Sequence, residues 1–227
     1  MSSTHLTDCM IEDVLETIDT AYRRHDGALV LTTSFGIHSA LMLDLASRAM
    51  PGIGVVWVDT GYLPEETHAF ASELEERFPI DLRVARSELS PEAFEARHGR
   101  PWETGRAEDL ALYHRVRKVE PMKRALDRLG AKATLAGLRR SQTDHRKKLS
   151  PVSEHWGRSK YLPVLDWTER AVMTYLNRRD LPMHPLFYEG YSTVGDWHSS
   201  RPHDAGEDAR ATRFGGVAQE CGLHLAG

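Results

Sequence analysis

The stretch Ala28-Leu-Val-Leu-Thr-Thr-Ser-Phe-Gly36 decides the fold class of this 227-residue chain. Residues 28–33 form a mostly apolar run bounded by glycine and serine, a pattern typical of a short strand buried inside a sheet. The turn at 34–36 leads into residues 37–50, whose apolar character favours a helix that ends at Pro51-Gly52. A strand, a turn and a helix in this order predict one βα unit of a parallel sheet.

The same alternation of strand and helix continues on both sides of this unit. We expect further strands at 53–58, 80–85, 131–136 and 161–165, and helices at 10–24, 64–78, 121–129 and 168–179, the last of them capped by Asp166. Strands that alternate with helices of about 10–15 residues predict an α/β fold with a doubly wound, mostly parallel sheet. Residues 1–195 are predicted to form this α/β domain, and residues 196–227 a flexible C-terminal tail.

The composition excludes several classes of protein. The chain carries 29 basic and 33 acidic residues, a net charge of −4, so it has no overall bias toward nucleic acid or an anionic membrane. No apolar run approaches the about 20 residues that cross a bilayer. The first residues lack the basic and then apolar segments of a secretory signal. We therefore expect a cytoplasmic protein that binds neither nucleic acid nor a membrane.

Cysteine is scarce, and its placement is informative. The two cysteines, Cys9 and Cys221, lie near opposite ends of the chain. A disulfide framework is therefore excluded, and so is an all-cysteine zinc or iron–sulfur site within one chain, because such sites need about four thiolates. His198 and His203 lie close together in the sequence, but no zinc-binding motif surrounds them. We expect no metal site.

Three polar loops follow predicted strands, at 34–36, 59–61 and 137–148. In a doubly wound sheet, ligands bind outside the carboxyl ends of the strands. Backbone N–H groups of the first loop, together with the positive end of the following helix, are suited to an anion, and the hydroxyls of Ser34 and Ser39 add donors. An ordinary strand–helix turn is the alternative interpretation, because the loop is not the phosphate-binding loop of nucleotide triphosphatases.

The third loop is strongly basic. Five permanent cations lie within ten residues: Arg139, Arg140, Arg146, Lys147 and Lys148. Guanidinium groups fit phosphate through two hydrogen bonds, so a polyanionic ligand is one interpretation. A solvated basic loop is the other, and a nucleic-acid patch is less favoured because no aromatic platform lies beside it.

Cys221 is the better candidate for a nucleophile. A thiol on a flexible arm near arginines has the environment that lowers a thiol pKa. An incidental surface cysteine is the alternative for Cys221, and it is the preferred interpretation for Cys9, which has no supporting neighbours.

Nine motifs occur in an order that resembles the assimilatory phosphoadenylyl-sulfate (PAPS) reductases. They are Thr33-Ser-Phe-Gly-Ile37, Asp59-Thr-Gly-Tyr-Leu63, Lys118-Val-Glu-Pro121, Gly137-Leu-Arg-Arg140, Glu189-Gly-Tyr191, Val194-Gly-Asp196, His198-Ser-Ser-Arg201, Thr212-Arg-Phe214 and Glu220-Cys-Gly-Leu-His224. The resemblance covers residues 28–224. It implies an adenine-nucleotide α-hydrolase-like fold, related to the PP-loop enzymes that use ATP, in which residues 1–195 bind the nucleotide.

The resemblance also implies the site residues. Ser34, Phe35 and Gly36 match the loop that would hold the phosphosulfate, and Asp59 matches a position near the nucleoside. The positions matched to phosphate and sulfate contacts are Arg139, Arg140, His198 and Arg201, with Ser39 and Arg213 as weaker matches. Arg146, Lys147 and Lys148 are candidates for the 3′-phosphate.

The reaction implied by the resemblance is the reduction of PAPS to sulfite and adenosine 3′,5′-bisphosphate. Cys221 would form an S-sulfocysteine, which reduced thioredoxin or glutaredoxin would resolve. The relatives that act on adenylyl sulfate (APS) usually bind a [4Fe–4S] cluster through paired cysteines, which this chain lacks. We therefore expect PAPS as substrate, no bound cofactor, and a homodimer as in the family.

Three alternatives remain at this point. One is a cluster-free APS reductase. Another is an adenylating enzyme of the ATP-pyrophosphatase type, although Ser34-Phe-Gly-Ile-His-Ser39 replaces the Ser-Gly-Gly-x-Asp-Ser of that group. The third is a non-enzymatic nucleotide- or RNA-binding module that uses loop 137–148.

Overall fold

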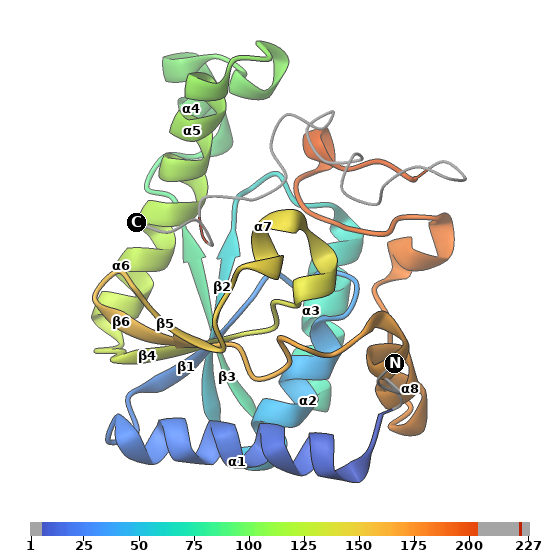
Figure 1. The fold of residues 1–227 in the computed structure, drawn as a ribbon. Coiled ribbons are helices and arrows are strands. Elements are labelled where there is room, and N and C mark those ends of the chain that lie inside the picture. Colours follow the sequence, from blue (N-terminus) through green and yellow to red (C-terminus); the bar gives the residue numbers. More distant parts are fainter. Residues whose placement is uncertain (1–5, 204–222, 224–227) are drawn as a thin grey trace.

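The computed structural model of the chain describes residues 6–203 and Leu223, and its centre is a six-stranded sheet (Figure 1). The strands are β1 (Leu29–Thr33), β2 (Ile53–Asp59), β3 (Ile80–Arg86), β4 (Ala133–Ala136), β5 (Val152–His155) and β6 (Arg158–Tyr161), in the order β3-β2-β1-β4-β6-β5. All neighbouring pairs are parallel except β5 and β6, which are antiparallel. The predicted mostly parallel sheet is confirmed.

Helices cover both faces of this sheet. They are α1 (Asp8–Arg24), α2 (Ser39–Ala49), α3 (Glu65–Arg77), α4 (Pro91–His98), α5 (Ala107–His114), α6 (Glu120–Arg128), α7 (Asp144–Lys147) and α8 (Glu169–Arg178). Successive strand residues point to opposite faces. Leu29 and Leu31 therefore pack into the larger core with α1, α2, α3 and α8, whereas Val30 packs against α6 in a smaller one. The doubly wound architecture is thus confirmed.

The strand order places a crevice beside β1. This strand lies between β2, which follows it in the chain, and β4, which comes much later. Connections from neighbouring strands leave in opposite directions at such a point, so the loops after β1 and β4 diverge and leave space between them. The loops predicted at 34–36 and 137–148 begin here.

One predicted strand was wrong. Residues 161–165 do not form a strand beyond Tyr161; the sheet instead ends in a β5–β6 hairpin that turns at Trp156 and Gly157, both with positive φ. Leu162 and Leu165 are buried in a small apolar cluster after the strand. A short apolar run indicates that its residues are buried, but a buried turn and a buried strand give the same run.

The cap predicted for the last helix was also wrong. The hydroxyl of Thr168, rather than Asp166, accepts the hydrogen bond from Ala171 N at the start of α8. The carboxylate of Asp166 lies two residues farther out and accepts from Arg140 Nη1 at 2.5 Å.

Within residues 196–200, Asp196 and Ser199 pack against the body of the protein, whereas residues 201–203 are exposed. Asp196 is fully buried, and a 3-10 turn at Trp197–Ser199 ends with Ser199 almost inaccessible. The boundary at 195/196 stays a prediction, because most of the predicted tail lies outside the described residues. Among the helices in the described residues, none has the length and apolarity to cross a membrane.

Candidate active site

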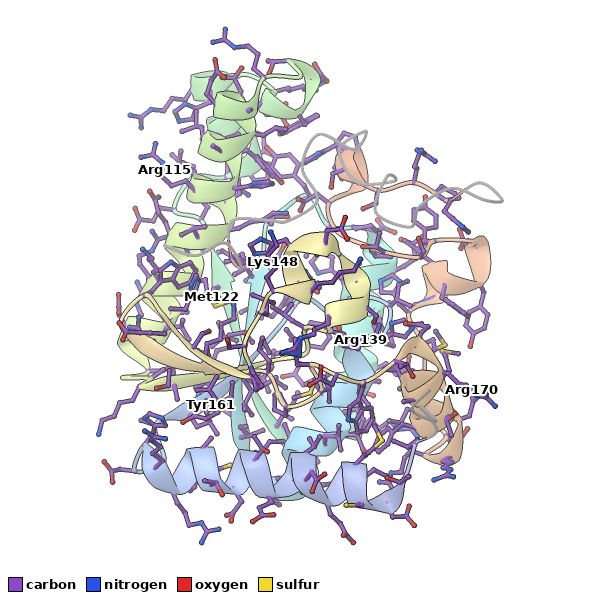
Figure 2. All side chains as sticks on the ribbon, viewed as in Figure 1. Arg115, Met122, Arg139, Lys148, Tyr161 and Arg170 are labelled. Carbon is purple, nitrogen blue, oxygen red and sulfur yellow. The ribbon has the colours of Figure 1, made fainter. Side chains whose placement is uncertain are left out.

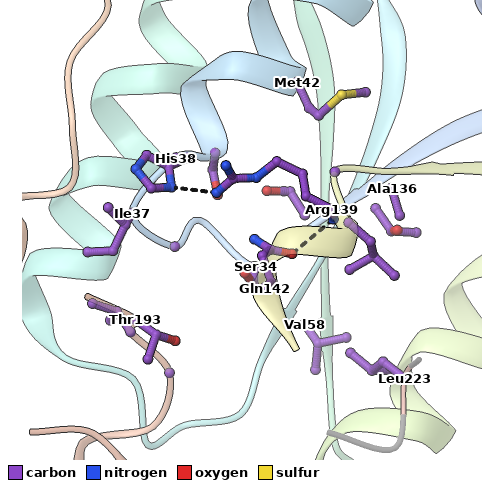
Figure 3. Close-up of a pocket in the computed structure, with 18 of the residues that line it drawn as sticks. Ser34, Ile37, His38, Met42, Val58, Ala136, Arg139, Gln142, Thr193 and Leu223 are labelled. Atoms are coloured by element: carbon purple, nitrogen blue, oxygen red, sulfur yellow. Dashed lines mark hydrogen bonds between the residues drawn. The ribbon is translucent and has the colours of Figure 1, made fainter. Parts of the chain in front are cut away.

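A pocket of about 640 Å³ opens at the carboxyl ends of β1 and β4 (Figure 3). It is lined by the loop after β1, the N-terminus of α2, the loop after β4, the β5–β6 hairpin, residues 192–196 and Leu223. Two of the three loops expected to bind ligand, 34–36 and 137–148, supply much of the pocket wall. Of the third loop, 59–61, only Thr60 lines the pocket. The crevice predicted from the strand order is where the pocket lies.

The loop at 34–36 divides its residues between the pocket and the core. Ser34 and Gly36 line the pocket. Phe35 has a φ of 47° and is fully buried, with its ring edge-on to Trp57 at 5.0 Å between ring centroids. The side chain of Phe35 therefore anchors the loop from behind and does not reach the pocket. Ser39, the first residue of α2, lines the pocket as well, so hydroxyls and a helix N-terminus face the same space.

Arg139 is the most tightly held cation of the pocket. Its side chain is buried, with Nη1 2.8 Å from Glu169 Oε2. Its Nη2 lies 3.3 Å from His38 Nδ1 (Figure 3). His38 Nε2 lies 3.0 Å from the other oxygen of Glu169. The hydrogen bond from His38, followed by the charges of His38 and then Arg139, outweighs burial and lowers the pKa of Glu169 to about 2. Figure 2 shows Arg139 inside the molecule, whereas Arg115 and Arg170 lie at its edge.

Loop 137–148 is more ordered than the sequence indicated. It contains α7, whose N-cap Thr143 accepts a hydrogen bond from Arg146 N, and this turn directs Arg146 inward. Arg146 is buried, lines the pocket and donates to Gln142 Oε1, which also accepts from the backbone N–H of Arg139 at 3.0 Å. Lys147 and Lys148 are exposed and do not line the pocket.

Lys118 lines the pocket but was not among the predicted site residues. A π-helical turn at Arg115–Val119 joins α5 to α6, and both Arg117 and Lys118 are buried in it. Lys118 Nζ lies 2.5 Å from Asp196 Oδ2, and both residues line the pocket. The hydroxyl of Thr60 donates to the other oxygen of Asp196 at 2.5 Å. Burial alone would raise the pKa of Asp196, but Lys118, His198 and Thr60 hold it well below its usual value.

The β5–β6 hairpin supplies a second group of unpredicted wall residues: His155, Trp156, Arg158 and Lys160. Lys160 is buried. Burial, and then the charge of Lys160, lowers the pKa of His155 to about 4, so this imidazole is neutral at neutral pH. The alternation of basic side chains at 158 and 160 was the one sequence signal for this wall.

Besides Phe35, four predicted site residues have side chains engaged outside the pocket: Asp59, Arg140, His198 and Arg201. Asp59 accepts from Gly61 N at 2.9 Å and from Arg86 Nε at 3.0 Å. Arg140 donates to Asp166 and to the carbonyl of Leu149. Contact of any of the four with a substrate stays a prediction.

His198 is stacked on Trp102, with ring centroids 4.1 Å apart, and its Nε2 lies 3.1 Å from the hydroxyl of Tyr113. Arg201 is exposed and donates to the carbonyl of Pro202. Arg213 and Cys221 lie outside the described residues. Leu223, two positions after Cys221, is described and lines the pocket.

The charges that face the pocket indicate its ligand. Lys118, Arg139, Arg146, Arg158 and Lys160 line it, against the carboxylates of Glu169 and Asp196. Val58, Met122, Leu126 and Trp156 add an apolar wall. Such a lining suits a ligand that has several negative charges and an apolar ring. Within residues 6–203 and Leu223, no three His, Cys, Asp or Glu side chains are grouped to hold a metal ion.

Comparison with known proteins identifies the family. The phosphoadenosine phosphosulfate reductase domain matches residues 28–202. The chain belongs to the phosphoadenosine phosphosulfate reductase family. It is 56% identical over 198 residues to a phosphoadenosine 5′-phosphosulfate reductase of Synechococcus sp., with 87% of this chain and 85% of the relative covered. A Synechocystis sp. protein of the same name is 53% identical over 200 residues, with 87% and 80% covered. The family resemblance found in the motifs is confirmed, and the chain is an oxidoreductase.

Solved structures agree with this assignment. A PAPS reductase from Candida auris, crystallised as a phosphate complex, matches with a TM-score of 0.65 and 25% identity, over 88% of this chain and all of that one. An FMN adenylyltransferase of Candida glabrata (TM-score 0.64, 12% identity, 91% and 71% covered) and an NAD synthetase of Campylobacter jejuni (TM-score 0.56, 14% identity, 81% and 77% covered) share the fold alone. The predicted relation to PP-loop enzymes is thereby confirmed at the level of fold.

Proposed function

We propose that this member of the family reduces PAPS to sulfite and adenosine 3′,5′-bisphosphate in assimilatory sulfate reduction, with Cys221 as the nucleophile. The observation that carries the proposal is the pocket: buried arginines and lysines surround a serine-containing loop at a helix N-terminus, and Leu223 lies on the wall. Two residues of chain span at most about 7 Å, so a thiol at position 221 is within reach of a ligand in the pocket.

The pocket has a cationic wall and an apolar wall, and each suits a different part of the substrate. The loop at 34–36, the N-terminus of α2 and the guanidinium of Arg139 offer donors for the phosphosulfate. The adenine ring is accommodated by the apolar wall. PAPS carries a 3′-phosphate in addition, and the cations Arg146 and Lys160 add to those that the phosphosulfate requires. This surplus of buried positive charge supports PAPS over APS as the substrate.

The first chemical step is a sulfo-group transfer. The Cys221 thiolate attacks the sulfur of the sulfo group, a sulfur–sulfur bond forms, and the bond from that sulfur to the phosphate oxygen breaks. The oxygen leaves with the electron pair on adenosine 3′,5′-bisphosphate. Because negative charge grows on the departing phosphate, fixed cations such as Arg139 stabilise the transition state more than the bound substrate.

The second step needs a dithiol protein. A thiolate of reduced thioredoxin or glutaredoxin attacks Sγ of the S-sulfocysteine, and sulfite leaves with the electron pair of the sulfur–sulfur bond. The second thiol of the donor then displaces Cys221 from the mixed disulfide. The donor dithiol loses two electrons, the substrate sulfur gains two, and no bound cofactor or iron–sulfur cluster takes part. This step places the protein in the cytoplasm, where such donors are kept reduced.

The test is sulfite release from PAPS with reduced thioredoxin, compared for the wild type, Cys221→Ser and the matched control Cys9→Ser. We expect the first substitution to abolish release and the control to leave it unchanged. Sulfite release that survives Cys221→Ser contradicts the mechanism. APS at equal concentration serves as a second arm: equal or faster turnover of APS refutes the substrate assignment, and ATP–pyrophosphate exchange in place of sulfite release refutes the reductase function.

A further inference from the structure

We propose that Arg117 is a positioning residue, whose buried guanidinium clamps loop 59–61 and thereby holds Lys118, its neighbour in the chain, at the wall of the pocket. The inference rests on the function proposed above, in which the cations of this wall act on the charged groups of PAPS. It goes beyond that function by assigning a task to a residue that does not line the pocket.

The side chain of Arg117 is buried, and its guanidinium contacts main-chain carbonyls and aromatic rings. Nε and Nη2 both donate to the carbonyl oxygen of Thr60, Nε at 2.8 Å, and Nη1 donates to the carbonyl oxygen of Leu89 at 2.5 Å. The ring centroids of Tyr62 and Phe94 lie 5.2 and 5.7 Å from Cζ of Arg117. These contacts fix the guanidinium in position and in orientation.

The partners of Arg117 are unusual for a buried cation. Within the described part of the chain, its N–H groups donate to neutral carbonyl oxygens and to no carboxylate. Burial of a charge is costly, and a carbonyl compensates it less than an opposite charge does. Stability alone therefore gives no reason for an arginine at this position, whereas a planar fork that grips a loop does.

Loop 59–61 is shaped to admit this side chain. Gly61 has a φ of 77°, and a Cβ at this position would lie 2.8 Å from Arg117 Nη2 and 2.7 Å from Pro91 Cγ. Any other residue at position 61 would therefore displace the guanidinium from the carbonyl of Thr60.

The loop passes the restraint on to the pocket. The hydroxyl of Thr60 donates to Asp196 Oδ1 at 2.5 Å, and Asp196 Oδ2 lies 2.5 Å from Lys118 Nζ. Because Lys118 follows Arg117 directly in the chain, these contacts close a ring of four residues. Thr60, Asp196 and Lys118 line the pocket, and Arg117 stands behind them. In a closed ring each contact restricts the others, so loss of the clamp frees the ammonium of Lys118 to move.

The π-helical turn Arg115–Val119 makes the ring possible. In an α-helix neighbouring side chains point about 100° apart, so two adjacent long side chains seldom both face the interior. In this turn Arg117 and Lys118 are both buried, whereas Arg115 is exposed. Such turns are frequent at functional sites. Here the turn directs one cation to loop 59–61 and the next to Asp196.

The first test measures kcat/KM for sulfite release from PAPS in Arg117→Met and Arg117→Lys. The first variant removes the charge and all the hydrogen bonds, and the second keeps the charge but loses the planar fork. We expect both to lower kcat/KM about tenfold. The matched control is Arg115→Met, which removes the same charge from an exposed position of the same turn and is expected to retain the wild-type value. Wild-type kcat/KM in Arg117→Lys refutes the clamp, because charge alone would then suffice.

A double-variant cycle tests whether Arg117 acts through Lys118. Lys118→Met removes the ammonium that the clamp is proposed to hold. In this background we expect Arg117→Met to change kcat/KM less than about twofold, because the two side chains act through one path. A further tenfold loss in the Lys118→Met background contradicts the proposal, since Arg117 would then act by a route of its own.

The ammonium of Lys118 can also be followed without turnover, by nuclear magnetic resonance of protein with isotopically labelled lysine nitrogen. A buried, hydrogen-bonded ammonium exchanges its protons slowly, and loss of the signal in Lys118→Met assigns it. We expect the signal to be shifted or lost in Arg117→Lys and retained in Arg115→Met. An unchanged signal in Arg117→Lys refutes the positioning role, whatever the turnover of that variant.

The outcomes separate this inference from the function beneath it. If the wild type releases no sulfite from PAPS, the proposed function fails, and the Lys118 signal still decides the positioning role. If the wild type releases sulfite and Arg117→Lys does so with equal kcat/KM, the positioning role alone is refuted. If urea unfolding shows that Arg117→Met does not fold, Arg117→Lys and its combination with Lys118→Met carry the decision.

Discussion

Replacement of Asp196 by asparagine breaks the most deeply buried ion pair that the structure describes at the pocket. The side chain of Asp196 is inaccessible and that of Lys118 is 8% exposed, with 2.5 Å between Nζ and Oδ2. Asparagine keeps the shape and can still accept the hydrogen bond from Thr60, so the substitution removes chiefly the negative charge. What remains is an ammonium group without its counter-charge.

The expected magnitude follows from this geometry. Removing one partner of a buried pair costs about 3–5 kcal/mol of folding free energy. Lys118 borders the pocket, where water can solvate part of its charge, so we expect the lower end, about 3 kcal/mol. For a chain of this size each kcal/mol lowers Tm by about 2–4 °C, which predicts a decrease of about 6–12 °C.

The assay combines thermal and urea unfolding with steady-state kinetics. Asp44→Asn is the matched control, because Asp44 is equally buried but bonds Tyr175 and Arg179 between α2 and α8, away from the pocket. Both variants are expected to lose stability, but only Asp196→Asn to lose turnover. Adding Lys118→Met to Asp196→Asn is expected to restore stability, since no unpaired charge then remains. An Asp196→Asn protein within 1 kcal/mol of the wild type, or no recovery in the double variant, refutes the reasoning.

Two further predictions concern the network around Arg139. Arg139→Lys loses the planar fork that spans Glu169 and His38, so we expect the KM for PAPS to rise about tenfold without loss of fold; an unchanged KM measured by steady-state kinetics contradicts this. The pKa of Glu169 is lowered from 4.5 to about 2, so its stabilisation is present above pH 4.5 and is lost as pH falls toward 2. Because this carboxylate is more than half exposed, Glu169→Gln is expected to remove no more than about 1 kcal/mol at neutral pH. Its acid-unfolding curve, followed by circular dichroism, is expected to be flatter than that of the wild type between pH 4.5 and 2, and identical slopes contradict the assignment.

The central strands of the fold were predictable because each is a buried apolar run whose length is typical of a strand. The apolar runs at 28–33 and 53–58 lie between helices, and no other element of that length fits them. The β5–β6 hairpin was not predictable in the same way. Its strands are short and mostly polar, and β5 is largely exposed, so hydrophobic periodicity carries no signal for them. The buried turn after β6 carried an apolar run instead.

The loops that form the site were predictable from the sequence. Which of their side chains point into the pocket was not. Arg139 and Arg140 are adjacent and chemically identical, yet one is buried in the pocket and the other faces Asp166. The 3-10 turn that begins at Arg140 sends them apart, and no property of the two residues encodes this. Lys118 begins one of the family motifs, but its direction was not predictable, because it lies in a charged stretch whose π-helical turn directs it inward.

Covalent capture of the sulfo group on Cys221 tests the central claim most directly. The protein would be incubated with PAPS without any dithiol and then analysed by mass spectrometry of its peptides. The account predicts one SO₃ group on the peptide that contains Cys221, released adenosine 3′,5′-bisphosphate in equal amount, and loss of the adduct with sulfite release when reduced thioredoxin is added. Sulfite formation without any adduct, or an adduct on Cys9, would contradict it.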